Sequence, residues 1–67
     1  MHDEKIANDI RKIAQIFLMP NKELIKEYGF LQNPPYSLKE ENRQDVLISL
    51  VISQLNELAD SVEEGKE

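Results

Sequence analysis

The segment Val46-Leu47-Ile48-Ser49-Leu50-Val51-Ile52 decides how this chain folds, because six of its seven residues are apolar. It lies within residues 37–63, which contain neither proline nor glycine and repeat their apolar positions at helical spacing. A seam with alternating steps of three and four residues runs through this stretch, formed by Ile48, Val51, Leu55, Leu58 and Val62. The pattern therefore predicts one long α-helix over residues 37–63.

Local signals place the two ends of this helix. Asn33-Pro34-Pro35 cannot continue a helix, because proline lacks the N–H donor and clashes with the preceding turn. Ser37 and Glu40 match the capping-box pattern of a helix start. We expect the helix to begin at Ser37 and to end before Gly65, and residues 65–67 to form a disordered acidic tail.

The long helix is apolar around more of its circumference than one neighbour covers. A helix that packs on one neighbour needs an apolar arc of about 100°, whereas the central turns here show roughly 200°. We expect the first helix of the same chain to cover the side with Ile48, Ile52, Leu55 and Ala59. A second copy is expected to cover the other side, through an interface of Val46, Leu47, Leu50, Val51, Gln54, Leu58 and Val62. The alternative is a monomer whose own segments cover the whole arc.

The first half of the chain predicts two further helices. Residues 3–18 form an amphipathic helix that Pro20 ends, with an apolar stripe of Ile6, Ile10, Ile13 and Phe17. A short helix over residues 22–28 follows, with Asn21 as its N-cap and Gly29 as a left-handed stop. Residues 29–36 are then a loop stiffened by proline.

These elements predict an all-α fold, a helical hairpin in one domain over residues 1–64. A chain of this length buries only about 60% of its unfolded surface, and it has no cysteine for disulfides. Oligomerisation is the common remedy, so we expect two hairpins to dimerise into a four-helix bundle. Antiparallel pairing would bring Lys39 and Arg43 near the acidic end of the partner's helix, at residues 60–64.

The composition argues against several classes of partner. The net charge of −5 and the absence of a basic stripe disfavour nucleic acid. No apolar run approaches the roughly 20 residues of a membrane span, and no signal peptide is evident. The lack of cysteine suits a reducing cytoplasm. We expect a cytoplasmic protein without a nucleic-acid or membrane partner. A DNA-binding regulator is the least favoured alternative.

The sequence contains no evident catalytic, cofactor-binding or metal-binding group. There is no cysteine, and the single histidine, His2, stands at the start of the chain, so no nucleophile has an evident base. The adjacent carboxylates Glu40/Glu41 and Glu63/Glu64 are expected at wet helix ends. We therefore expect no enzyme, no catalytic residues, no cofactor and no metal site.

The function that remains is protein–protein interaction. The chain is interpreted as a small regulator, inhibitor or adaptor that acts as a homodimer and binds another protein; its size and acidity are similar to those of small regulators from bacteria and their phages. The alternative is a structural component whose oligomer is itself the product. Recognition more often lies in loops than in cores, so the candidate partner-binding residues are Tyr28, Phe30, Leu31 and Tyr36. The alternative is that these four side chains fill the core.

Overall fold

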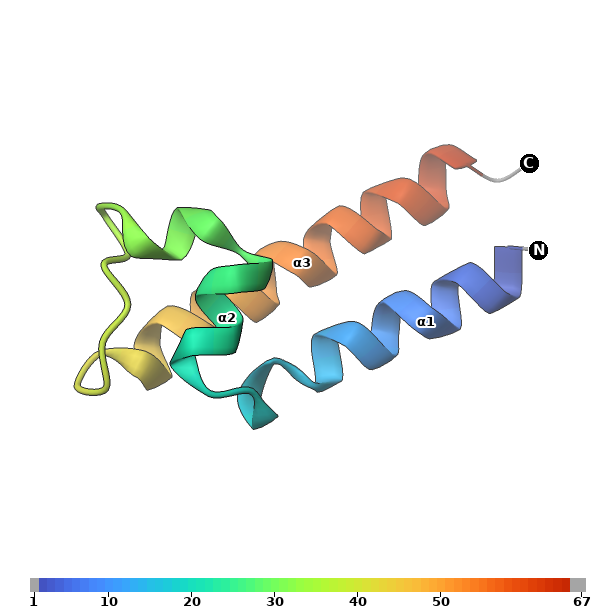
Figure 1. Cartoon of the computed structure of the whole chain (residues 1–67). Helices are drawn as coiled ribbons and strands as arrows, with labels where there is room; N and C mark the ends of the chain where they lie inside the picture. The colour runs from blue at the N-terminus through green and yellow to red at the C-terminus, as the bar shows by residue number, and fades with distance from the viewer. Residues whose placement is uncertain (1, 66–67) are drawn as a thin grey trace.

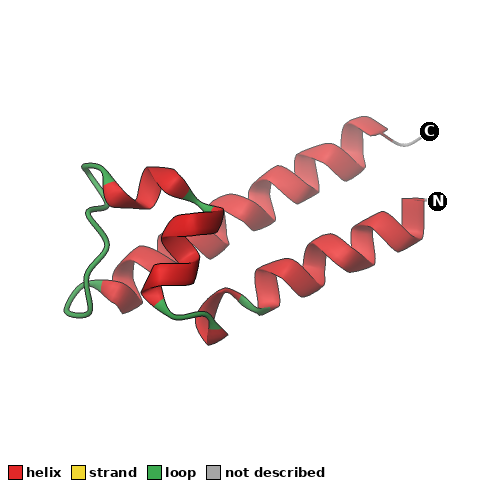
Figure 2. Cartoon of the chain, in the orientation of Figure 1, coloured by secondary structure: helices red, strands yellow, loops and turns green. Residues whose placement is uncertain are grey.

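Three α-helices joined by short 3-10 segments make up residues 2–65, the part of the chain that the computed structural model describes (Figure 1). The order is α1 (His2–Ala14), η1 (Ile16–Leu18), α2 (Asn21–Glu27), η2 (Gly29–Gln32) and α3 (Arg43–Gly65). Within these residues there is no strand, as Figure 2 shows. The long helices α1 and α3 run side by side in opposite directions, and α2 lies across the end where they are connected (Figure 1). The predicted all-α class is confirmed, and the arrangement is compatible with the predicted hairpin.

α1 ends four residues earlier than the predicted helix over residues 3–18. The Gln15 N–H is shared between the carbonyls of Arg11 (3.1 Å) and Lys12 (3.2 Å), which tightens the backbone. A 3-10 turn at residues 16–18 follows before Pro20. Ile16 is fully buried, whereas Ile10 and Phe17 are each about half exposed, so the predicted apolar stripe is wrong at Ile10 and at Phe17.

α2 matches the predicted short helix closely, but both of its predicted caps are wrong. Asn21 is the first helical residue rather than the N-cap, and the carbonyl of Pro20 accepts the first helical hydrogen bond, from the N–H of Leu24 at 3.0 Å. Gly29 does not adopt a left-handed conformation, since no glycine in residues 2–65 has positive φ. The chain instead continues through Tyr28 into η2, so the predicted loop over residues 29–36 begins with a helical turn.

α3 begins at Arg43, six residues later than predicted, because the expected capping box does not form. Ser37 has a φ of 43°, which places it in the left-handed region and outside any helix. The next residue, Leu38, is buried in the core, and its N–H donates to the carbonyl of Leu31 at 2.8 Å. Burial of Leu38 therefore replaces the helical turn that the sequence pattern indicates. At the other end, α3 continues to Gly65, and the rest of the predicted tail lies outside the described residues.

The side chain of Asn42, the residue before α3, forms hydrogen bonds with residues 36–39, the segment found in place of the predicted helical turn. Its side-chain oxygen accepts a hydrogen bond from the N–H of Lys39 at 2.7 Å. Its side-chain nitrogen donates to the carbonyls of Tyr36 and Ser37, both at 3.1 Å. The carbonyl of Asn42 accepts the first helical hydrogen bond of α3, from Val46 at 3.0 Å. One side chain thus holds residues 36–39 against the start of the helix.

Arg43, the first residue of α3, forms hydrogen bonds with the segment that connects α1 and α2. Its guanidinium donates to the carbonyl of Met19 at 2.7 Å, to that of Phe17 at 3.2 Å, and to the side-chain oxygen of Asn21. The planar guanidinium serves several acceptors at once, which a lysine cannot do with the same geometry. Arg43, which the sequence predicts to pair with a partner's acidic end, is instead bound within its own chain.

The core gathers at the connected end of the hairpin. It contains one buried residue or more from each helical segment and one from the loop, and comprises Ile13, Ile16, Leu24, Leu31, Leu38, Val46, Leu47 and Leu50. Four of these side chains, Ile16, Leu24, Leu31 and Leu47, are fully buried. α2, η2 and Leu38 therefore pack on α3 together with α1.

This packing reverses the predicted roles of the two sides of α3. Val46, Leu47 and Leu50, expected in a dimer interface, lie in the chain's own core. Ile48, Ile52 and Leu55, expected beneath the first helix, are exposed. The physical reason is that α2, η2 and Leu38 require an apolar surface of their own, which the sequence pattern leaves out of account. They pack on the side with Val46, Leu47 and Leu50. The side with Ile48, Ile52 and Leu55 is left exposed.

The molecule is longer and more exposed than its size requires. Its radius of gyration is 13.1 Å, against about 11 Å for a compact domain of this length. Its accessible surface is 5135 Å², whereas a folded monomer of this mass exposes about 4,400 Å². The excess is consistent with a helix pair that is covered on one side only.

Candidate protein-interaction face

One side of the α1/α3 pair carries a set of exposed apolar side chains, which we call the open face. It consists of Ile10 and Phe17 from the first third of the chain, Ile48, Ile52, Leu55 and Val62 from α3, and the small exposed residues Ala14 and Ala59. Each of its six large side chains remains between 43% and 54% exposed. Such a grouping differs from the single exposed apolar residues that are normal on protein surfaces.

Helix geometry shows that the α3 part of the open face is one stripe. Ile48, Ile52 and Leu55 are spaced by four and three residues, and Val62 follows two turns after Leu55, so all lie along one side of the helix. The adjacent residues Ile48 and Leu47 are 100° apart on the helix, so the stripe stands beside the buried side rather than on it. The stripe therefore flanks the contact between α1 and α3.

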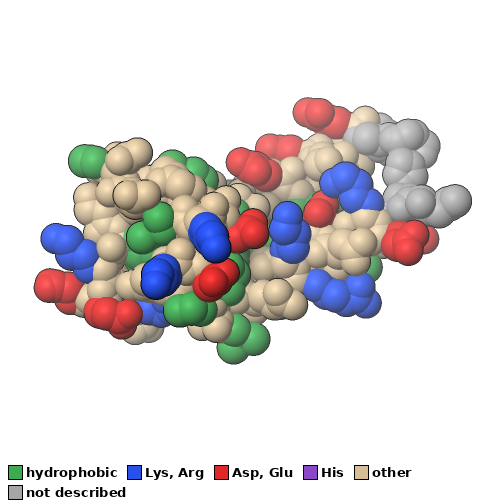
Figure 3. Space-filling model, in the orientation of Figure 1, with side chains coloured by type: hydrophobic (Ala, Val, Ile, Leu, Met, Phe, Trp, Pro, Cys, Tyr) green, Lys and Arg blue, Asp and Glu red, His purple; other side chains and the backbone are tan. Residues whose placement is uncertain are grey.

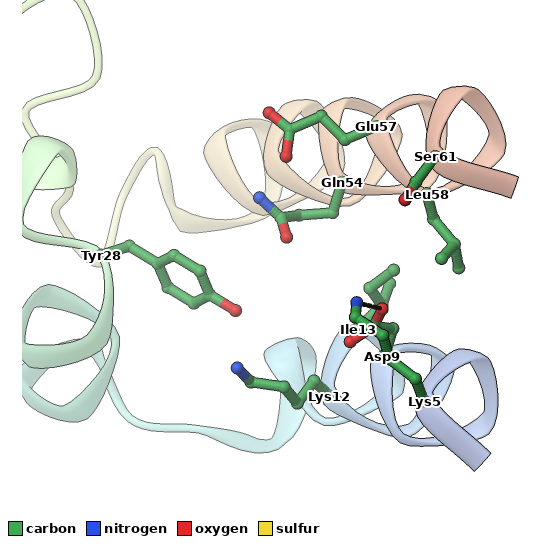
Figure 4. Close-up of a pocket in the computed structure, with 9 residues that line it drawn as sticks. All are labelled: Lys5, Asp9, Lys12, Ile13, Tyr28, Gln54, Glu57, Leu58 and Ser61. Atoms are coloured by element: carbon green, nitrogen blue, oxygen red, sulfur yellow. Dashed lines mark hydrogen bonds and ion pairs between the residues drawn. The ribbon is translucent and has the colours of Figure 1, made fainter. Parts of the chain in front are cut away.

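The opposite flank of the helix pair is polar. A groove of about 260 Å³ runs there between α1 and α3, lined by Lys5, Asp9, Lys12, Ile13, Tyr28, Gln54, Glu57, Leu58 and Ser61. Figure 4 shows the side chain of Tyr28 reaching into this groove toward Lys12 and Gln54. Lys5 and Asp9 form an ion pair at 2.9 Å on its edge. Ile10 lies about 160° around α1 from Lys12, and Leu55 lies about 160° around α3 from Glu57. The open face is therefore on the other side of the helix pair from the groove.

The side that carries α2 is covered by mixed charge. Figure 3 shows basic and acidic side chains spread over this side, with apolar side chains in smaller areas between them. Neither sign of charge dominates the view. This surface resembles an ordinary solvated one, which leaves the open face as the more distinctive feature of the molecule.

Three aromatic side chains form a second, smaller cluster at the connected end. The rings of Tyr28 and Phe30 meet edge to face with centroids 6.1 Å apart, and those of Phe30 and Tyr36 are tilted with centroids 5.6 Å apart. Both tyrosines pack against the core, while Phe30 is 48% exposed. Leu31, predicted as a fourth contact residue, is fully buried in the core and presents no surface to a partner.

The predicted dimer-interface residues separate into three groups. Val46, Leu47 and Leu50 are buried in the core, and Val51, Gln54 and Leu58 are partly buried. Val62 alone belongs to the open face. The sequence pattern predicts Ile48, Ile52 and Leu55 beneath the first helix, whereas they are exposed. It also predicts Ile10 and Phe17 in the core stripe of that helix, and both are about half exposed. The available signal was the apolar arc of α3, which is too wide for one neighbour but does not indicate which side stays free.

Two structural criteria bear on other kinds of site. Across residues 2–65, no helix combines the length and the apolar character that crossing a membrane requires. The same residues bring together no group of three or more His, Asp or Glu side chains able to hold a metal ion.

Comparison with protein-family models, with curated proteins and with solved structures finds no match to this chain. The features of the molecule that bear on function are therefore the open face and the surfaces around it.

Proposed function

We propose that this protein is a small, non-enzymatic protein–protein interaction module, a regulator, inhibitor or adaptor, that binds apolar helices through its open face. The observation that carries the proposal is the exposure of six large apolar side chains on one side of α1, η1 and α3. Two adjacent helices present a shallow apolar surface of the kind that receives another helix. Formation of a homodimer as a four-helix bundle belongs to this proposal as one form that the contact can take.

The energetic argument supports association rather than solvent exposure. Burial of apolar surface contributes about 25 cal/mol per Å². The accessible surface of 5135 Å² exceeds that of a compact monomer by roughly 750 Å², which is close to the ~800 Å² that each partner contributes to a standard interface. Burial of the exposed side chains of the open face in a complex would recover part of this surplus.

Charge substitution on the open face tests this proposal. Ile52→Glu places a carboxylate in the middle of the face, where a partner would have to bury it unpaired. Ser53→Glu is the matched control, because it adds the same charge to the neighbouring exposed position, 100° around α3 and outside the face. Circular dichroism should show that both variants remain helical.

The readout is chemical crosslinking of the tagged chain in an extract of its source cells. The wild-type chain and Ser53→Glu should give the same crosslinked species, with itself or with another protein. Ile52→Glu should lose them. If Ile52→Glu retains every crosslinked species of the wild type, the open face is not the contact surface and the proposed function is wrong.

The aromatic cluster is a candidate for a second contact. Its support is the half-exposed ring of Phe30, held between Tyr28 and Tyr36. Aromatic side chains are enriched at interfaces because they supply large contact areas with few rotatable bonds. In the same crosslinking experiment, Phe30→Ala should reduce the yield of species formed with another protein.

A further inference from the structure

We propose that the open face is occupied by a second copy of this chain, with the two α3 helices antiparallel and Leu55 of each copy beside the two-fold axis. This inference depends on the proposed function, because it names the partner of the same face. It differs from the dimer that the sequence predicts, because three residues of that interface lie in the core and three more are partly buried.

The spacing of the apolar residues in the α3 stripe makes the stripe self-complementary under a two-fold rotation. Ile48 and Val62 each stand seven residues, about two turns, from Leu55. A two-fold axis at Leu55 therefore brings Ile48 of one copy level with Val62 of the other. It also brings Ile52 level with residue 58, one position before Ala59 on the facing helix, so the large side chain of Ile52 lies near the small one of Ala59. Interfaces with two-fold symmetry require this kind of self-complementary patch.

The charges around the stripe favour the same occupant. Two charged residues lie between Ile48 and Val62, and neither belongs to the open face: Glu57 lines the polar groove on the other flank of α3, and Asp60 lies about 80° around the helix from Ile52. A second open face therefore brings no unpaired charge into the contact, whereas most other surfaces would. The remaining charges of the two acidic chains stay at the rim, where salt screens their repulsion.

The surplus surface of the whole chain is large enough to include one side of a dimer interface. The surplus surface of each chain, roughly 750 Å², is close to the ~800 Å² that one partner contributes to a standard interface. Ile10 and Phe17 extend the contact beyond α3, so α1 of each copy joins the interface. The assembly would be a four-helix bundle, with α2 on its outer surface.

The first measurement is the mass of the purified chain by light scattering over a hundredfold range of concentration. We expect twice the chain mass, and a dissociation constant that falls as salt rises, because each chain carries a net charge of −5. Ala59→Glu should raise the dissociation constant at least about tenfold by bringing a carboxylate into the contact. This variant removes no packed side chain, so it keeps the test valid even if Ile52→Glu unfolds.

The position of the axis is tested by single cysteines, since the chain has none of its own. Under mild oxidation, Leu55→Cys should form a disulfide-linked dimer, because a disulfide needs Cβ atoms about 3.5–4.5 Å apart. Ser53→Cys, on another side of α3, should remain monomeric under the same conditions. A dimer that forms without the Leu55→Cys disulfide would overturn the arrangement.

The two proposals fail in different ways. A chain that stays monomeric at every concentration, while the crosslinks in the extract depend on Ile52, has another protein on its open face; the second-copy inference is then wrong and the proposed function stands. Crosslinks that do not depend on Ile52 overturn the proposed function itself.

Discussion

Asn42 shows how a single polar side chain determines where a helix begins. Its amide makes three hydrogen bonds to the backbone of residues 36–39, and these hold that segment in a non-helical conformation. Asparagine is suited to this role because its side chain both donates and accepts. The Ser37/Glu40 capping pattern is a weaker, local preference, and it loses to these bonds together with the burial of Leu38.

Asn42→Ala should therefore destabilise the protein. Each of the three hydrogen bonds contributes about 0.5–1.5 kcal/mol, so we expect the free energy of unfolding to fall by about 1.5–4.5 kcal/mol. Urea unfolding followed by circular dichroism measures this. Asn56→Ala is the control, because Asn56 is exposed on α3 and should change stability by less than about 0.5 kcal/mol. Equal stability of the Asn42 variant and the wild type would show that its bonds do not hold the segment.

α3 has two apolar sides with different roles, although both are built from the same residue types. The side with Leu47 faces α1, α2 and η2, and the side with Ile48 belongs to the open face. The exposed surface of a side chain, not its hydrophobicity, therefore decides what its removal costs.

Leu47→Ala and Ile48→Ala test this assignment directly, because the two positions are neighbours. Leu47→Ala should lower the free energy of unfolding by about 2–5 kcal/mol, since it leaves a cavity in the core. Ile48→Ala should lower it by less than about 1 kcal/mol when measured at a protein concentration low enough to keep the chain monomeric. Thermal or urea unfolding provides the comparison, and a larger loss for Ile48→Ala would mean that the sides are reversed.

The molecule as a whole is a helix pair covered on one side. α2, η2 and the buried Leu38 close the side at the connected end, while large apolar side chains of α1, η1 and α3 remain exposed. Small domains bury a limited fraction of their surface, so a chain of this size gains much from any contact that covers the rest. Stability and association are therefore expected to be linked.

This linkage predicts a melting temperature that depends on protein concentration. If dissociation accompanies unfolding, a hundredfold increase in concentration should raise the melting temperature by roughly 5–10 °C. Differential scanning calorimetry at several concentrations measures the shift. Ala59→Glu should reduce it, whereas Ser53→Glu should leave it unchanged. A wild-type melting temperature that is the same at all concentrations would contradict the linkage.

The sequence by itself determines the all-α class, the approximate extent of α2 and the interruptions at Pro20 and at Asn33-Pro34-Pro35. These features depend on residues within a few positions of one another, through helical periodicity and the backbone limits of proline. It also predicts correctly that α3 has more apolar surface than one neighbour covers.

Only the tertiary structure decides where α3 begins and which of its sides remains free. Both depend on contacts between distant parts of the chain, such as the bonds from Arg43 to the carbonyls of Phe17 and Met19. An apolar arc of roughly 200° offers two sides of similar character, so local pattern does not distinguish them. The choice follows from where α2, η2 and Leu38 find room to pack, and this is a property of the assembled fold.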